Sequence, residues 1–224
     1  MTVQANMTDT TPVAPAALAE FEAEFADQLE LAADAQDLLF RAARTANSFS
    51  DEPVTDDQIR AIYELVKYAP TAANSQPLRI VFVRSDAAKE RLLPLMSEGN
   101  RVKTASAPVV ALLAVDNDFH EEMPKVFPHA GETMRDSLAQ NAEGRAAMAR
   151  LSAGLQIGYF IIGVRAAGLA AGPMAGFDAE AVSLEFFPDG KHDVLVVVNI
   201  GKPGENPWFD RNPRLDFTEV ATIL

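Results

Sequence analysis

The sequence predicts one α/β domain in which helices cover both faces of a β-sheet. Two continuous apolar runs, residues 107–116 and 193–201, fit central strands that are covered on both faces. Helical patterns at about 56–67 and 144–167 supply covering layers. No internal repeat, low-complexity segment or linker is evident, so residues 36–224 are expected to form a single domain.

The elements follow in order from local signals. An apolar stripe with acids between predicts a helix from Pro15 to about residue 43. Thr55 and Gln58 have capping-box spacing, which predicts that a helix begins at residue 56. A strand is expected over 79–84. The remaining expected elements are a helix over 86–96, a nearly all-apolar helix over 144–167 and a short helix from about Thr218.

Charge bounds the possible partners. The 224 residues carry 32 Asp and Glu against 19 Lys and Arg, which gives a net charge of −13 and argues against nucleic acid as a partner. Residues 1–40 hold eight acids and neither Lys nor Arg, so they carry −8 of that total. Residues 1–35 are therefore predicted to be an acidic extension, helical or partly disordered, and the rest can still hold a cationic site.

Several function classes lack their signals. The chain has no cysteine, which excludes disulfides, thiolate nucleophiles and Cys-based metal sites. The N-terminus lacks the regions of a secretory signal, and no run approaches about 18 uninterrupted apolar residues, so we expect a cytoplasmic protein with no membrane partner. The three histidines are isolated, and no metal site is expected.

The common catalytic motifs are also missing. There is no G-x-G-x-x-G after a strand, no phosphate-binding P-loop and no G-x-S-x-G nucleophile elbow. No nucleophile or acid–base constellation stands out. If the protein is an enzyme, a bound cofactor is expected to carry the chemistry.

Five segments share small residues, amide side chains and an occasional cation. Each alone is explained by turn geometry or by surface ion pairing. They are "ARTANSF" (43–49), "PTAANSQP" (70–77), "GNRVK" (99–103), "GPMAGF" (172–177) and "NPRLDF" (212–217), of which the first four are expected to be loops.

Together, in order over about residues 40–220, these segments resemble the FMN-dependent nitroreductase family. Residues 70–77 match its Pro-Ser-x-x-Asn-x-Gln-Pro loop with Thr71 at the Ser position, and residues 173–177 match its Pro-x-x-Gly-Phe loop. Residues 44–47 stand where the family has Arg-Ser-x-Arg. Asn100 and Lys103 precede an Ala-Pro strand start, and Arg214 is the C-terminal basic residue.

The resemblance implies an α+β fold: a three-layer α/β/α sandwich around a mixed, largely antiparallel sheet. It also implies tightly bound FMN, NADH or NADPH as co-substrate, and ping-pong hydride transfer through the flavin N5. The partner it implies is a second copy, in a homodimer with FMN at the interface and the helix at 144–167 in the dimer core. The carried-over cofactor-binding residues are Arg44, Thr45, Asn47, Pro70, Thr71, Ala72, Asn74, Gln76, Asn100, Lys103, Pro173, Met174, Ala175, Gly176 and Arg214.

Each part of FMN has expected contacts. Arg44, Thr45 and Arg214 suit the phosphate dianion. Asn74, Asn100 and Lys103 suit the pyrimidine edge, and small residues at 175 and 176 let backbone N–H groups approach N5. No protein side chain is assigned as the catalytic group, and His129 is a candidate proton donor.

Finer detail resembles the RutE branch of the family, the malonic semialdehyde reductases of pyrimidine catabolism. "VFPH" and "GPMAGFD" carry this likeness, as do two departures from the wider family, Asn47 in place of a cation and Ala175 in place of Glu. The implied reaction is reduction of malonic semialdehyde to 3-hydroxypropionate. The alternatives are a broad nitroaromatic, quinone or enal reductase on the same scaffold, and a non-catalytic acidic binding module.

The phosphate assignment makes a prediction for two arginines. Replacing Arg44 or Arg214 by alanine removes a cation from the FMN phosphate and should weaken FMN retention. The measurement is flavin occupancy after dialysis of each variant beside the wild type. Unchanged occupancy would remove that arginine from the site.

Overall fold

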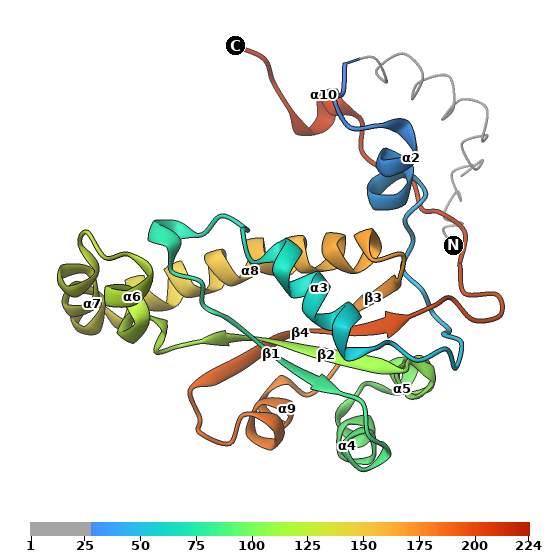
Figure 1. Ribbon diagram of the computed structural model, residues 1–224, viewed down its shortest axis with the longest axis horizontal. Coiled ribbons are helices and arrows are strands. Elements are labelled where there is room, and N and C mark those ends of the chain that lie inside the picture. The colour runs from blue at the N-terminus through green and yellow to red at the C-terminus, as the bar shows by residue number, and fades with distance from the viewer. Residues whose placement is uncertain (1–27) are drawn as a thin grey trace, which may run out of the picture. The chain divides into compact units, whose positions relative to one another are not determined.

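The computed structural model describes residues 28–224, and these divide into two compact units: residues 37–208, and residues 28–36 together with 209–224. The larger unit holds the sheet (Figure 1). Its strands are β1 (Leu78–Val83), β2 (Val109–Asp116), β3 (Ala170–Met174) and β4 (His192–Gly201). Its longer helices are α3 (Asp56–Val66), α4 (Asp86–Leu92), α5 (Glu98–Ser106), α7 (Gly131–Gln140), α8 (Ala142–Ala166) and α9 (Ala179–Phe186).

Short elements complete the description. The larger unit also contains the π-helical turn η1 (Asp37–Arg41), the 3₁₀ turns η2 (Ala72–Asn74), η3 (Leu93–Leu95) and η4 (Phe119–Glu122), and α6 (Met123–Val126). The smaller unit has α2 (Ala33–Gln36) and α10 (Phe217–Val220). Of the helix expected from Pro15, the part before residue 28 lies outside the described residues, and beyond it only Ala33–Arg41 is helical. The predicted domain boundary near residue 36 stays a prediction.

The sheet has the order β1-β2-β4-β3, and every neighbouring pair is antiparallel. The two continuous apolar runs form the central strands, as the sequence predicts. Along β2, alternate residues face opposite layers because side chains alternate across a strand. Ala111 and Leu113 pack in the core under α3 and α8, and Leu112 and Ala114 in the core under α4 and α9.

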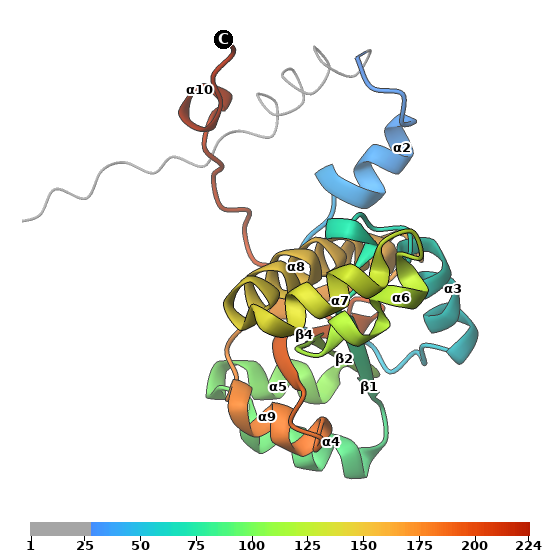
Figure 2. The ribbon, with the colours of Figure 1, turned by 90° about the vertical axis from the view of Figure 1, so that its left-hand side faces the viewer.

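Helices cover both faces, which confirms the predicted sandwich. In Figures 1 and 2, α3, α6, α7 and α8 lie on one side of the sheet and α4, α5 and α9 on the other. The capping box predicted at Thr55 is confirmed, since the Thr55 hydroxyl accepts from Gln58 N and the Gln58 side chain accepts from Thr55 N.

Among the described helices, α8 is long and apolar enough to cross a membrane, by length and composition only. The core helix of a soluble protein meets the same test. In this structure α8 packs on α3 and on the sheet.

Two segments expected as loops are regular structure. "GNRVK" lies inside α5, and Gly172–Met174 form the end of β3. Both were misjudged because glycine and polar residues lower helix and strand propensity, while the surrounding tertiary contacts decide the outcome. The two segments therefore present their side chains from rigid elements.

The crossing of α3 and α8 depends on one glycine. A Cβ at Gly163 would lie 2.2 Å from Val66 Cγ1 and 3.4 Å from Ile62 Cγ2, so only hydrogen fits between the two helices. Gly163→Ala should destabilise the protein by about 1–3 kcal/mol through overpacking. Gly99→Ala is the control, since nothing lies within 4 Å of its added methyl group. Urea unfolding of both variants measures the difference; equal stabilities would show that the helices separate without cost.

Candidate functional site

The Arg44 segment runs beside β3. Ala46 N donates to Ala171 O at 3.4 Å and Asn47 N donates to Pro207 O at 2.9 Å, so the segment is fixed to the sheet edge and to the chain after β4. A Cβ on Gly172 would lie 2.9 Å from Ala46 O, which explains why glycine stands there. Arg44 is half-buried and has no hydrogen-bond or ion-pair partner among the described residues.

The loop after β3 is joined to the start of α5. Asn100 Nδ2 donates to Gly176 O at 2.8 Å, and Ser97 N donates to the same carbonyl at 3.0 Å. Gly176 has no room for a side chain, because a Cβ would lie 2.6 Å from Asn100 Nδ2. The structure therefore brings the Asn100 and Gly176 motifs together.

This junction leaves polar groups available. Lys103 lies on α5 one turn after Asn100, half-buried, with no ammonium partner among the described residues. The N–H groups of Ala175 and Gly176 likewise make no hydrogen bond within the described part of the chain. We call Arg44, Asn100, Lys103, Ala175 and Gly176 the β3-edge half-site. It offers two cations, one amide and two backbone donors to an anionic ligand.

The "PTAANSQP" loop lies elsewhere in the same chain. It leads into β1, which is the opposite edge strand from β3. Three strand spacings of about 4.8 Å separate these edges by about 14 Å. Within one chain the structure does not bring Thr71, Asn74 or Gln76 to the β3-edge half-site. In Figure 1 the turn between α3 and β1 lies near α6 and α7, and α5 lies at the other end of the sheet.

Asn74 is tied to the protein itself. Its Nδ2 donates to Val126 O at 2.8 Å, while its Oδ1 has no partner among the described residues. Gln76 turns back and donates from Nε2 to Asn74 O at 3.3 Å. Ala72 N donates to Ser152 Oγ of α8. The exposed Asn74 therefore retains an acceptor for a ligand, and its donor is committed to the backbone.

The loop backbone is strained. Ala73, Asn74 and Gln76 have φ values of 49°, 52° and 45°, the left-handed region that favours glycine. Each such residue costs on the order of 1 kcal/mol, less for Asn. Gln76 also precedes Pro77, a position that prefers extended backbone. No peptide bond in the described chain is cis, so the turn is made by these dihedral angles alone.

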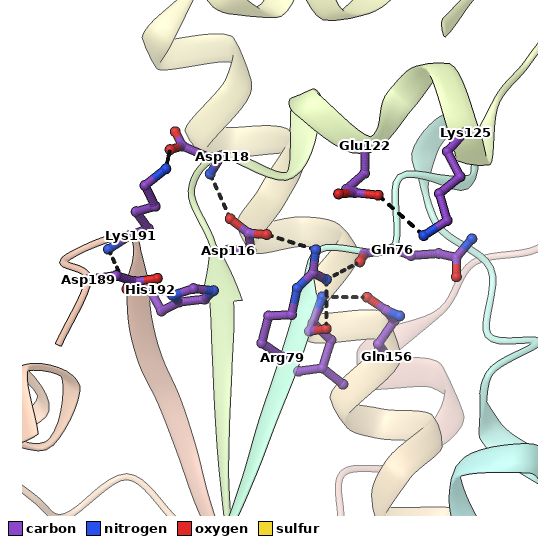
Figure 3. Close-up of polar contacts among 11 residues, drawn as sticks. Gln76, Arg79, Asp116, Asp118, Glu122, Lys125, Gln156, Asp189, Lys191 and His192 are labelled. Atoms are coloured by element: carbon purple, nitrogen blue, oxygen red, sulfur yellow. Dashed lines mark hydrogen bonds and ion pairs between the residues drawn. The ribbon is translucent and has the colours of Figure 1, made fainter. Parts of the chain in front are cut away.

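An ion pair that sequence reasoning missed lies under this loop. Arg79 Nη2 and Asp116 Oδ2 are 2.7 Å apart, and Arg79 Nη1 donates to Gln76 O at 2.9 Å and Leu78 O at 3.0 Å (Figure 3). Gln156 of α8 accepts from Leu78 N. The signal in the sequence was a cation near the start of one apolar strand, Arg79, and an acid at the end of another, Asp116.

Further ion pairs line the same end of the sheet. Lys191 Nζ lies 3.0 Å from Asp118 Oδ2, and this hydrogen bond lowers the pKa of the Asp118 carboxyl. His192 Nδ1 lies 2.9 Å from Asp189 Oδ1, and the hydrogen bond lowers the pKa of Asp189 (Figure 3). Asp118 N also donates to Asp116 Oδ1, so this group is continuous with the Arg79 pair.

The remaining predicted residues lie as follows. His129 is exposed, with its ring edge-on to Phe127 at 5.4 Å. Thr45 is exposed and Asn47 is half-buried beside it. Arg214 belongs to the smaller unit, where its Nη1 donates to Asn212 O and Pro213 O. Its expected phosphate contact stays a prediction.

A groove of about 620 Å³ lies between α3 and β1, beside the strained loop. Its lining includes Tyr63, Lys67, Gln76 and Arg79. A second hollow, of about 360 Å³, lies by α9 and β4. Neither of these two hollows is lined by Asn100, Lys103 or Gly176.

Comparisons with known proteins agree with this geometry. Residues 40–202 match the family model described as "Nitroreductase family". A Streptomyces griseus protein provisionally named NADH dehydrogenase/NAD(P)H nitroreductase is 59% identical over 190 residues, which cover 85% of this chain and 96% of that protein.

Solved structures share the fold. The nitroreductase homologue YdfN of Bacillus subtilis superposes with a TM-score of 0.74 at 24% identity, covering 83% of this chain and 97% of that one. A nitroreductase homologue of Exiguobacterium sibiricum in complex with FMN also reaches 0.74, at 18% identity, covering 87% and 99%. The expected fold is confirmed, and the family match and the close relative show that this chain belongs to the Nitroreductase family.

Proposed function

We propose that the protein is an FMN-dependent NAD(P)H reductase of the RutE type, which reduces malonic semialdehyde to 3-hydroxypropionate in pyrimidine catabolism in the cytoplasm. The observation that carries the cofactor assignment is the β3-edge half-site, where Arg44, Lys103 and the N–H groups of Ala175 and Gly176 have no partner among the described residues. Family membership makes the chain an enzyme that uses FMN and NAD(P)H.

The half-site fits FMN by its chemistry. Arg44 and the neighbouring Thr45 hydroxyl suit the phosphate dianion. Asn100 and Lys103 suit the pyrimidine edge, and the N–H groups of Ala175 and Gly176 suit the flavin N5. Bound FMN supplies hydride transfer between NAD(P)H and the second substrate. Lys103 places positive charge where reduction adds negative charge.

The second part of the site comes from a second copy of the chain. Because the Thr71–Gln76 loop lies at the opposite sheet edge, one chain presents two separate halves. A homodimer joins the loop of one copy to the β3 edge of the other. The surface for this contact is one face of α8, where Leu151, Leu155 and Tyr159 are exposed at four-residue spacing with Gly154 and Gly158 between them.

Hydride addition to the aldehyde would give an alkoxide, which needs a proton to become the alcohol product. His129 is exposed three residues after Val126, whose carbonyl anchors Asn74, so its ring lies on the segment that holds the loop. We propose His129 or water as the donor. No described ion pair or hydrogen bond holds the His129 ring in another role.

A nitroaromatic or quinone reductase is the second candidate. The 59% identical Streptomyces relative, with NAD(P)H nitroreductase in its name, favours it. A broad reductase needs an open flavin face, and Ala175 would present only a methyl group there. Both candidates share every cofactor contact, so only substrate preference separates them. A non-catalytic acidic module has no observation in its favour.

Substrate preference is the decisive measurement. The purified protein should be yellow, and kcat/KM at fixed NAD(P)H should be higher for malonic semialdehyde than for a nitroaromatic or a quinone. A clear preference for the nitroaromatic would defeat the semialdehyde assignment and leave a nitroreductase. A colourless protein that takes up no FMN would reject both.

Lys103 makes a second prediction, on the flavin potential. Lys103→Gln should lower the reduction potential of bound FMN, by about 30 mV for each 1.4 kcal/mol of lost stabilisation of the two-electron reduced form. Lys191→Gln is the control, because that charge is paired with Asp118. Spectroelectrochemical titration measures both. Equal potentials in the two variants would remove Lys103 from the flavin.

A further inference from the structure

The Thr71–Gln76 loop adopts a backbone conformation that its own residues do not favour. It contains no glycine, yet three of its residues are left-handed. Within the loop, Asn74 N donates to Thr71 O and Ser75 N donates to Ala72 O, both at 3.1 Å, and Gln76 N donates to Thr71 Oγ1 at 3.3 Å. A short strained turn without glycine persists only where surrounding groups fix it. The contacts made from outside the loop are therefore the ones that decide its conformation.

Those outside contacts come from three places. Val126 O, at the end of α6, accepts from Asn74 Nδ2 at 2.8 Å. Ser152 and Gln156 lie one turn apart on α8 and accept from the N–H groups of Ala72 and Leu78, which lie on either side of the left-handed residues. Arg79 donates to the carbonyl oxygens of Gln76 and Leu78. Gln76 is thus the strained residue whose carbonyl is held by a charged donor.

The guanidinium is itself fixed. Its Nη2 pairs with Asp116 at 2.7 Å, and Asp116 is only 12% exposed at its side chain. The other Asp116 oxygen accepts from Asp118 N at 2.8 Å, and Asp116 N donates to Pro77 O at 2.9 Å. The guanidinium is planar and its N–H donors point at fixed angles. Because Asp116 fixes the guanidinium, the Gln76 and Leu78 carbonyl oxygens that it binds are fixed as well.

Strand pairing does not need this ion pair. β1 and β2 are already joined over six residue pairs, from Leu78 with Val115 to Val83 with Val110. A second arginine at the other end of β1, Arg84, pairs with Asp56 at 2.7 Å and donates to Val54 O at 2.9 Å. Arg84 thus makes the same kinds of bond to a segment outside the site, and it provides a matched control.

We propose that Arg79, held by Asp116, is a positioning residue that sets the left-handed backbone of the Thr71–Gln76 loop, so that Thr71 and Asn74 Oδ1 meet the cofactor across the dimer. The proposal rests on the proposed function for its consequence in catalysis. The hold on the loop itself is independent of any cofactor.

The experiment compares Arg79→Met, Arg79→Lys, Asp116→Asn and the control Arg84→Met in the full chain. Hydrogen–deuterium exchange of the peptide covering residues 71–79, without FMN, reports the loop. FMN affinity, kcat and KM report the site. Thermal unfolding reports general stability and identifies a variant that fails to fold.

Arg79→Met should exchange faster in this peptide, bind FMN about 10-fold more weakly and raise KM, because a small misplacement of contact groups is costly. Arg84→Met should leave loop exchange, FMN affinity and KM unchanged, although its melting temperature should be similar to that of Arg79→Met. Arg79→Lys should keep the ion pair but not restore the loop, since an ammonium lacks the fork. Asp116→Asn, which keeps the acceptor for Asp118 N, should shift the same quantities by less and serves if Arg79→Met does not fold.

Equal loop exchange in the Arg79→Met and Arg84→Met variants would overturn the proposal, and so would wild-type exchange in Arg79→Lys. A variant with an unprotected loop but normal FMN affinity and KM would refute the role in the site and leave the proposed function standing. Failure of the wild type to bind FMN would instead reject the proposed function, while the exchange data would still decide what holds the loop.

Discussion

Burial of β2 and β4 at the centre of the sheet is the constraint on which the other features depend. All eight residues of β2 are buried, and both faces need a helical layer to remain so. Once two central strands are fixed, β1 and β3 can only be edges. The motif loops that enter β1 and leave β3 are then held apart within the chain, whatever their own residues prefer.

The two halves of the proposed site are built by opposite means. At the β3 edge, glycines remove side chains so that backbone can approach: Gly172 against Ala46 O, and Gly176 against Asn100. At the β1 edge there is no glycine where the backbone needs one, and side chains from α8 and β1 hold the strained turn. At the β3 edge, the missing side chains of the two glycines would leave room for a ligand. At the β1 edge, neighbouring side chains contact a backbone whose φ angles its residues do not favour.

Much of this was accessible from the sequence, and the remainder was not for physical reasons. Continuous apolar runs predicted β2 and β4, and Thr55 with Gln58 predicted the start of α3, because burial and capping are local signals. The loop conformation at Ala73 and Gln76 was not predictable, since neither residue favours a positive φ and the groups that contact the loop, Arg79 and α8, are distant from it in pattern or sequence. "GNRVK" was misjudged because its helix is stabilised by contacts with Gly176 and the chain before it. The residues of the β3-edge half-site were found only through family resemblance, as single residues there have ordinary structural explanations.

The placement of the two half-sites on opposite edges has a thermodynamic consequence in the proposed dimer. A cofactor that contacts both copies binds the dimer more tightly than the single chain, so ligand binding and association are linked equilibria. Bound flavin would then strengthen subunit association. Dilution of the protein would favour the single chain and so weaken flavin binding. Retention of the cofactor becomes a property of protein concentration as well as of any one residue.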